Sequence, residues 1–152
     1  MTSALQRPHI LIVSDDHGLS EFLAEGLIYA GFWTSVIASA FQALEVFRLR
    51  SFDLILLDAA LGGIGTVELL RRLRGHSPRA ASAARTDIPV LLLAANKTEV
   101  PPELSDLVAP AEVLVAPLEI EEIAVAINAK VKQWRTEHPG RAWADEAALG
   151  SQ

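Results

Sequence analysis

The chain has no cysteine among its 152 residues. Without a thiol it can form neither a disulfide nor a thiolate zinc site, and an iron–sulfur cluster and a cysteine nucleophile are excluded for the same reason. Aromatic residues are also few, at 6% of the chain, whereas 51% of the residues are apolar. That apolar share lets one domain of this length bury a core of its own, and two domains would not fit comfortably.

Apolar residues come in short runs, so the sequence lacks a stretch that could cross a bilayer. A charged and then apolar leader for secretion is also missing, and we expect a cytoplasmic protein with no membrane contact. Basic residues are in the minority, with 13 Lys and Arg against 19 Asp and Glu, which gives a net charge of −6. This balance argues against direct DNA binding.

Five short runs rich in Val, Ile and Leu predict buried strands. Strands of a parallel sheet that is covered on both faces read as continuous apolar runs. The runs are His9–Val13, Ser35–Ala38, Leu54–Leu57, Val90–Leu93 and Val113–Val115.

Segments with helical periodicity separate and follow these runs. Their apolar positions are Leu19, Phe22, Leu23 and Leu27 in the first; Phe41, Leu44 and Phe47 in the second; Val67, Leu70 and Leu73 in the third; and Ile120, Ile123, Ala124, Ile127, Val131 and Trp134 in the last. Ser39 is the expected N-cap of the second helix and Thr66 that of the third. Pro101 and Pro102 leave room only for a short fourth helix around 103–108.

This alternation of strands and helices predicts an α/β fold with a doubly wound parallel sheet and helices on both faces. We expect one domain over residues 8–136 and a tail or linker over 137–152. In such a sheet ligands bind beyond the carboxyl ends of the strands, at the point where the strand order reverses.

Carboxylates follow two of the predicted strands at that edge. Asp15 and Asp16 come after the first strand, and Asp58 ends the third. If these strands are neighbours, the carboxylates converge on one crevice, and Mg²⁺ is the natural occupant because it prefers carboxylate and water oxygens. The alternative is structural: Asp15 and Asp16 cap the first helix and Asp58 opens a turn. Spacing alone does not decide between the two.

The sequence resembles the receiver domain of bacterial two-component response regulators over roughly residues 8–134. The resemblance rests on the acids after strand one, the Asp that ends strand three, the small residues that end strand four and the proline after strand five. It implies a flavodoxin-like (CheY-like) five-stranded sheet in the order 2-1-3-4-5. It also implies that a histidine kinase phosphorylates Asp58 with Mg²⁺ held by Asp15, Asp16 and Asp58, and that Pro117 follows a cis peptide bond.

Several positions depart from the family pattern. Ser14 stands where the first acid of the family's pair is expected, which weakens the implied Mg²⁺ site. Ala94 replaces the hydroxyl residue that contacts the phosphoryl group, Ala116 replaces the lysine that pairs with it, and Val113 replaces the switch aromatic. A hydrogen bond to a charged group contributes about 1.5–3 kcal/mol. Losing the hydroxyl and the ammonium therefore removes most of what lets phosphorylation change the structure.

Two functions follow from the resemblance. The first is an atypical receiver that signals by protein–protein interaction, with weak or absent phosphorylation switching; the second is a conventional phosphoryl acceptor modified on Asp58 with Mg²⁺. Enzymes of similar topology are disfavoured, because 14–18 lacks the glycine pattern of a dinucleotide site. The expected partners are a histidine kinase or a downstream signalling protein. A second copy bound through the fourth helix, fifth strand and fifth helix is a further expectation, and DNA and membrane are not expected.

Overall fold

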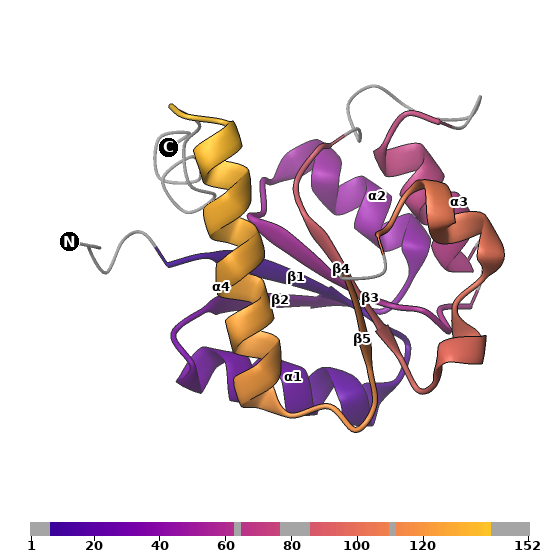
Figure 1. Ribbon diagram of the computed structural model, residues 1–152, viewed down its shortest axis with the longest axis horizontal. Coiled ribbons are helices and arrows are strands. Elements are labelled where there is room, and N and C mark those ends of the chain that lie inside the picture. The colour runs from indigo at the N-terminus through magenta and orange to yellow at the C-terminus, as the bar shows by residue number, and fades with distance from the viewer. Residues whose placement is uncertain (1–6, 63–64, 77–85, 110–111, 141–152) are drawn as a thin grey trace.

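The computed structural model describes residues 7–62, 65–76, 86–109 and 112–140. Within these residues strands and helices alternate along the chain (Figure 1). The elements are β1 (His9–Val13), α1 (His17–Tyr29), β2 (Trp33–Ile37), α2 (Ala40–Leu49), β3 (Leu54–Asp58), α3 (Gly65–Leu73), β4 (Val90–Ala94), the 3-10 helices η3 (Lys97–Glu99) and η4 (Pro102–Asp106), β5 (Val113–Val115) and α4 (Ile120–Glu137). The predicted alternation is confirmed.

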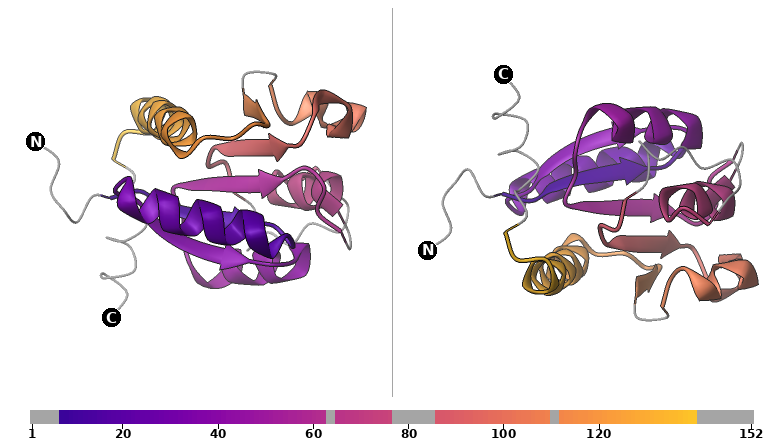
Figure 2. Two further views of the ribbon diagram at one scale, coloured as in Figure 1. Left: turned by 90° about the horizontal axis from the view of Figure 1, so that it is seen from below. Right: turned by 90° about the horizontal axis from the view of Figure 1, so that it is seen from above.

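The five strands form one parallel sheet in the order β2-β1-β3-β4-β5. Both the doubly wound architecture and the strand order are therefore as predicted. The arrowheads of the strands point the same way, so their carboxyl ends share one edge of the sheet (Figure 2). β1 lies between β2 and β3, which makes the gap between β1 and β3 the point where the strand order reverses.

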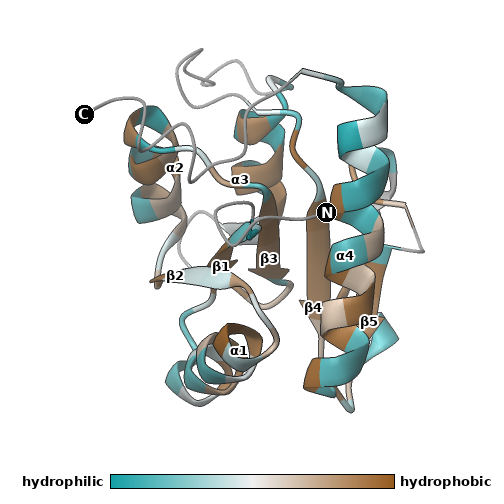
Figure 3. Ribbon diagram, turned by 90° about the vertical axis from the view of Figure 1, so that its left-hand side faces the viewer, coloured by the Kyte–Doolittle hydropathy of each residue, from teal (hydrophilic) through white to brown (hydrophobic). Residues whose placement is uncertain are grey.

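Alternation along the strands divides the core into two layers. Side chains of one parity, such as Ile10 and Ile12, pack with Leu23 and Leu27 of α1 and Ile127 of α4. Strand β4 and the part of β3 before Asp58 are hydrophobic, whereas the edge strand β2 is coloured as less hydrophobic (Figure 3). This matches burial of the central strands on both faces and partial exposure of β2.

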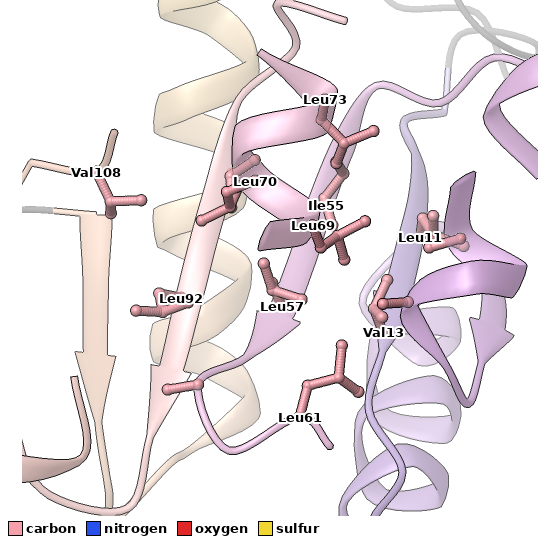
Figure 4. Close-up of a cluster of buried hydrophobic side chains, with 14 of the residues drawn as sticks. Leu11, Val13, Ile55, Leu57, Leu61, Leu69, Leu70, Leu73, Leu92 and Val108 are labelled. Atoms are coloured by element: carbon pink, nitrogen blue, oxygen red, sulfur yellow. The ribbon is translucent and has the colours of Figure 1, made fainter. Parts of the chain in front are cut away.

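Side chains of the other parity face α2, α3 and η4. Leu11 and Val13 of β1 and Leu57 of β3 join Leu69 and Leu70 of α3 in this cluster (Figure 4). Two layers of buried apolar contact thus fix the sheet from both sides, and they hold its carboxyl edge in place.

Local signals explain where the helices start and stop. Ser39 accepts a hydrogen bond from Gln42 N at 3.2 Å, so it caps α2 as predicted. After α1, Gly31 has a φ of +100°, and Phe32 N bonds to Leu27 O while Gly31 N bonds to Ile28 O. This pair of bonds is a Schellman motif, which favours glycine at the left-handed position.

The predicted third cap is wrong. Thr66 lies inside α3, and its hydroxyl donates to the main-chain oxygen of Asp58 instead. The apolar face of two helices also differs from the prediction, since Phe22 is 44% exposed and Phe41 is 59% exposed. Strand β2 begins at Trp33, earlier than the predicted Ser35, because its register with β1 extends through a half-exposed edge.

The fourth helix is short, as Pro101 and Pro102 predict, but it is 3-10 rather than α-helical. Pro102 occupies the first position of η4, where its missing N–H costs nothing. The helix between β4 and β5 was one of three elements through which a second copy was expected to bind, and among the described residues it is only a short 3-10 helix.

Arg74 forms hydrogen bonds that stabilise the segment leading into β4. Its guanidinium donates to the main-chain oxygens of Thr86 and Ile88, both at 2.7 Å. Burial lowers the pKa of Arg74, and the nearby carboxylates of Glu112 and Asp87 oppose that shift.

In the described part of the chain, none of the helices combines the length and apolar character needed to span a bilayer.

Candidate functional site

Residues Ser14 and Asp58 meet at the carboxyl edge of the sheet because their strands are neighbours. Val13 of β1 is in register with Leu57 of β3, so the residues that follow them lie side by side. Asp58 is 7% exposed and Ser14 is 3% exposed. This is the place where sequence reasoning puts the candidate phosphoacceptor.

The Ser14 hydroxyl donates a hydrogen bond to Asp58 Oδ2 at 2.7 Å. Ser14 Oγ in turn accepts a hydrogen bond from Asp16 N at 3.1 Å. The Ser14 hydroxyl therefore acts both as a donor and as an acceptor, and these two bonds fix its orientation toward Asp58.

The other oxygens of Asp58 are held by the chain that follows β3. Ala60 N donates to Asp58 Oδ1 at 2.8 Å, which closes a turn. Thr66 Oγ1 donates to the main-chain oxygen of Asp58 at 2.8 Å. The carboxylate is therefore bonded on both oxygens by the chain's own donors.

Asp15 and Asp16 are exposed and each accepts a main-chain N–H. Asp16 Oδ1 accepts from Leu19 N at 3.1 Å and so caps α1, which is the structural alternative considered for this residue. Asp15 Oδ2 accepts from Gly62 N at 3.1 Å and connects the β1 loop to the β3 loop. A Cβ at Gly62 would lie 3.2 Å from that carboxylate oxygen, so a side chain there would crowd the contact.

A pocket of about 380 Å³ opens between these loops. It brings together all three carboxylates of the sequence prediction, Asp15, Asp16 and Asp58, and adds Glu99. The described residues that line it are Asp15, Asp16, Leu19, Asp58, Ala60, Leu93, Ala94, Ala95, Glu99, Ala116 and Leu118. We call this space the Asp58 pocket; among the described residues its lining contains four carboxylates and no basic side chain.

Two alanines stand at the far side of the Asp58 pocket. Ala94 is buried at the end of β4, and Ala116 follows β5; Ala116 N donates to Ala94 O at 2.9 Å. The peptide bond between Ala116 and Pro117 is cis. Methyl groups at 94 and 116 supply neither a hydroxyl nor an ammonium to the space beside Asp58.

The three predicted Mg²⁺ ligands share the pocket but do not converge on one point. Asp16 caps a helix, Asp15 reaches Gly62, and Asp58 is bonded to Ser14 and Ala60. In the ranges the structure describes, no three His, Asp or Glu side chains group closely enough to hold a metal ion. The described residues thus form no three-carboxylate cage, and a Mg²⁺ ion here would have to keep water molecules as most of its ligands.

Glu99 of η3 was missed by sequence reasoning. Its Oε1 accepts from Ala95 N at 3.3 Å, which turns it toward the Asp58 pocket. No strand-end pattern marks Glu99, because a 3-10 turn after β4 places it there. Val113, the predicted switch position, lines a different cavity beside β5.

Comparisons with known proteins agree with this geometry. A family model described as the response regulator receiver domain matches residues 10–128. The chain is 30% identical over 132 residues to the uncharacterized transcriptional regulatory protein YkoG of Bacillus subtilis (strain 168), covering 85% of this chain and 53% of that protein. Over 127 residues it is 30% identical to the DNA-binding response regulator MtrA of Mycobacterium tuberculosis (H37Rv), covering 84% and 52%.

The fold has counterparts among solved structures. The receiver domain of the Francisella response regulator 1452 gives a TM-score of 0.67 at 22% identity and covers 84% of this chain and 98% of that chain. At this identity the likeness shows the fold alone. The chain spans about half the length of the curated relatives described above.

The sequence-based prediction of partners is wrong. It gave protein partners and no direct DNA binding, whereas the relatives include a regulator that is named as DNA-binding. The prediction rested on the net charge of −6, which describes this chain alone. That charge carries no information about the half of each relative that this chain does not cover.

Proposed function

The chain belongs to the response regulator receiver domain family, and we propose that it is an atypical receiver of two-component signalling, in which phosphorylation of Asp58 has little or no switching effect. It acts as a signalling domain, through the surface that it presents to other proteins. The observation that carries this proposal is the hydrogen bond from Ser14 Oγ to Asp58 Oδ2.

The charge of the Asp58 pocket supports the proposal. A phosphoryl group on Asp58 would bring negative charge next to Asp15, Asp16 and Glu99. Like charges that line one pocket repel one another, which disfavours a further negative charge there. Neither Ala94 nor Ala116 offers a donor that would offset this repulsion, so the phosphorylated form gains little from the pocket.

The test is exposure of the protein to acetyl phosphate, or to beryllofluoride, with magnesium present. We expect little Asp58-dependent modification by intact-mass measurement, and unchanged main-chain NMR signals for β4 and β5. Asp58→Asn is the matched control, because it keeps the size of the side chain and removes the nucleophile. Stoichiometric modification of wild type, lost in Asp58→Asn and accompanied by shifts at Ala94 and Ala116, would contradict the proposal.

A conventional phosphoryl acceptor is the second candidate. The observation that favours it is the presence of Asp15, Asp16 and Asp58 in one pocket. Binding of Mg²⁺ would then have to draw Asp16 from its bond to Leu19 N and Asp15 from Gly62 N. The same experiment separates the two functions, because a conventional acceptor responds at Asp58 and an atypical receiver does not.

We further propose that the receiver works in the control of transcription by a DNA-binding regulator. The names of the relatives support this, one being a transcriptional regulatory protein and the other a DNA-binding response regulator. Crosslinking and sequencing of the DNA that co-purifies with the protein, expressed from its own locus, provides the test. Specific enrichment of promoter DNA supports the proposal, and recovery no higher than that of an unrelated tagged protein refutes it.

For the domain boundary we propose a receiver over residues 8–136 and a tail or linker over 137–152. In the described residues α4 ends at Glu137, and His138 stacks on Trp134 with ring centroids 4.3 Å apart; residues 141–152 lie outside the description. Limited proteolysis with mass spectrometry is the test. Early cleavage after Pro139 with a protected remainder supports the boundary, and early cleavage inside 8–136 contradicts it.

A further inference from the structure

A cavity of about 570 Å³ lies beside β5, separate from the Asp58 pocket. It forms where the chain between β4 and β5 runs as two short 3-10 helices, because Pro101 and Pro102 interrupt any longer helix there. Its volume falls within the range of small-molecule sites, which is roughly 300–1,000 Å³. We call it the β5 cavity.

The walls of the β5 cavity are apolar. Val113 and Val115 contribute from β5, where both are half-buried. Leu104 and Val108 contribute from the opposite wall, where both are buried and belong to the core cluster. Val108 lies at the border of that cluster, beyond Leu92 (Figure 4). The cavity is therefore an extension of the hydrophobic core that reaches the surface.

Among the described residues that line the β5 cavity, Lys97 is the one with a charged side chain. Lys97 is exposed and forms no ion pair with any residue that the structure describes. Glu99, two residues further on, does not line the cavity; it bonds to Ala95 N and lines the Asp58 pocket. The charge at the β5 cavity is thus positive although the chain as a whole carries −6.

We propose that the β5 cavity binds a small amphipathic anion, an aliphatic or aromatic carboxylate. The apolar body lies against Val113, Val115 and Leu104, and the carboxylate pairs with Lys97. Apolar walls with one placed charge are the usual composition of small-molecule sites, in which burial supplies affinity and the charge sets orientation. This inference goes beyond the proposed function and does not depend on phosphorylation of Asp58.

Three probes of equal chain length test the proposal: decanoate, decanol and decylammonium, each below its micelle-forming concentration. Main-chain NMR signals of the full chain follow the titrations. We expect saturable shifts at Leu104, Val113 and Val115 with decanoate, weaker binding of decanol and the weakest binding of decylammonium. Equal affinities for the anion and the cation, or shifts confined to other surfaces, would overturn the proposal.

Two variants and one control locate the site. Lys97→Gln removes the charge at the cavity and weakens decanoate binding roughly fivefold, the upper end for an exposed ion pair. Lys132→Gln removes a charge from the exposed side of α4 and leaves binding unchanged. Val115→Trp fills the cavity and abolishes binding. Because Val115→Trp could unfold the chain, Lys97→Gln decides alone: equal affinities in Lys97→Gln and Lys132→Gln refute the proposal.

The alternative occupant is a second copy of this chain. Sedimentation of the wild-type protein separates the two possibilities. A monomer that binds decanoate supports the small-molecule site, whereas a dimer that decanoate does not dissociate and that Val115→Trp does dissociate shows a second copy in the cavity and overturns it.

Discussion

Ser14 Oγ lies 2.7 Å from Asp58 Oδ2 and donates a hydrogen bond to it across the β1–β3 boundary. A hydroxyl at this position neutralises part of the field of a buried carboxylate without adding charge of its own. An acid there would instead repel Asp58 and would need a cation between them. The residue at position 14 thus determines whether Asp58 has a hydrogen-bond donor or a second negative charge beside it at the end of β1.

Ser14→Ala should destabilise the fold. The substitution removes the donor to Asp58 Oδ2 and leaves that buried oxygen without its partner. We expect the free energy of unfolding to fall by about 1.5–3 kcal/mol, as for a hydrogen bond to a charged group. Urea denaturation at neutral pH gives the value. Ser51→Ala, at an exposed serine before β3, is the control and should change the stability by under about 0.5 kcal/mol. An equal loss in both variants would show that the Ser14–Asp58 bond contributes nothing.

Asp16 should behave as a helix cap. Asp16→Ala removes the acceptor for Leu19 N and should cost about 1 kcal/mol, whereas Asp16→Asn keeps an equivalent acceptor and should cost little. Thermal unfolding followed by circular dichroism, with and without magnesium, distinguishes the variants. If Asp16 acted mainly as a metal ligand rather than as a helix cap, magnesium would raise the melting temperature of the wild type, and this effect would disappear in Asp16→Asn.

Restoring the groups that the pocket lacks should restore phosphorylation. The triple variant Ser14→Asp, Ala94→Thr, Ala116→Lys supplies an acid, a hydroxyl and an ammonium around Asp58. We expect modification by acetyl phosphate with magnesium to rise by roughly tenfold over wild type, because charge-assisted contacts then stabilise the transferred group. Intact-mass spectrometry measures the modified fraction.

The control for the triple variant adds Asp58→Asn to it. Modification should then vanish while the fold, followed by circular dichroism, stays intact. A folded triple variant that is modified no faster than wild type would show that other features of the pocket prevent the reaction.

Substitutions in α4 should destabilise the fold on the helix face that packs against the sheet and should have little effect on the exposed face. Ile127 is fully buried, and Ile127→Ala should lower the free energy of unfolding by about 2–5 kcal/mol. Val125 on the same helix is 70% exposed, and Val125→Ala should stay within about 0.5 kcal/mol of wild type. Urea denaturation of both variants checks the contrast. Similar losses in both would indicate that α4 packs with a different face.

The sheet could be predicted from the sequence because each central strand is buried on both faces, and hydrophobic runs as short as Val90–Leu93 favour a strand over a helix. The edge strand β2 was predicted too short, since Trp33 and Thr34 lie at a half-exposed edge where polarity carries little information. The helix faces were predicted less well. Phe22 and Phe41 are apolar in sequence yet exposed, because three-residue spacing leaves the exact direction of a side chain open.

The sequence predicted which residues line the Asp58 pocket better than it predicted the hydrogen bonds that those residues form. The rule for strand ends brings Asp15, Asp16 and Asp58 to one edge, and all three line the same space. Spacing left the cap by Asp16 as one of two alternatives, and it did not indicate that Thr66 bonds to Asp58 O or that Glu99 joins the lining. These contacts depend on loop geometry, for which the sequence between the strands contains no periodic signal.

Val115 and Ala116 are consecutive residues, yet the first lines the β5 cavity and the second the Asp58 pocket. The end of β5 and the residue after it therefore contribute to the linings of both spaces. Thermodynamic linkage then demands reciprocity: by whatever factor an occupant of one space alters affinity in the other, the second occupant alters the first by the same factor. An occupant of either space that displaces the end of β5 would therefore alter the lining of the other space as well.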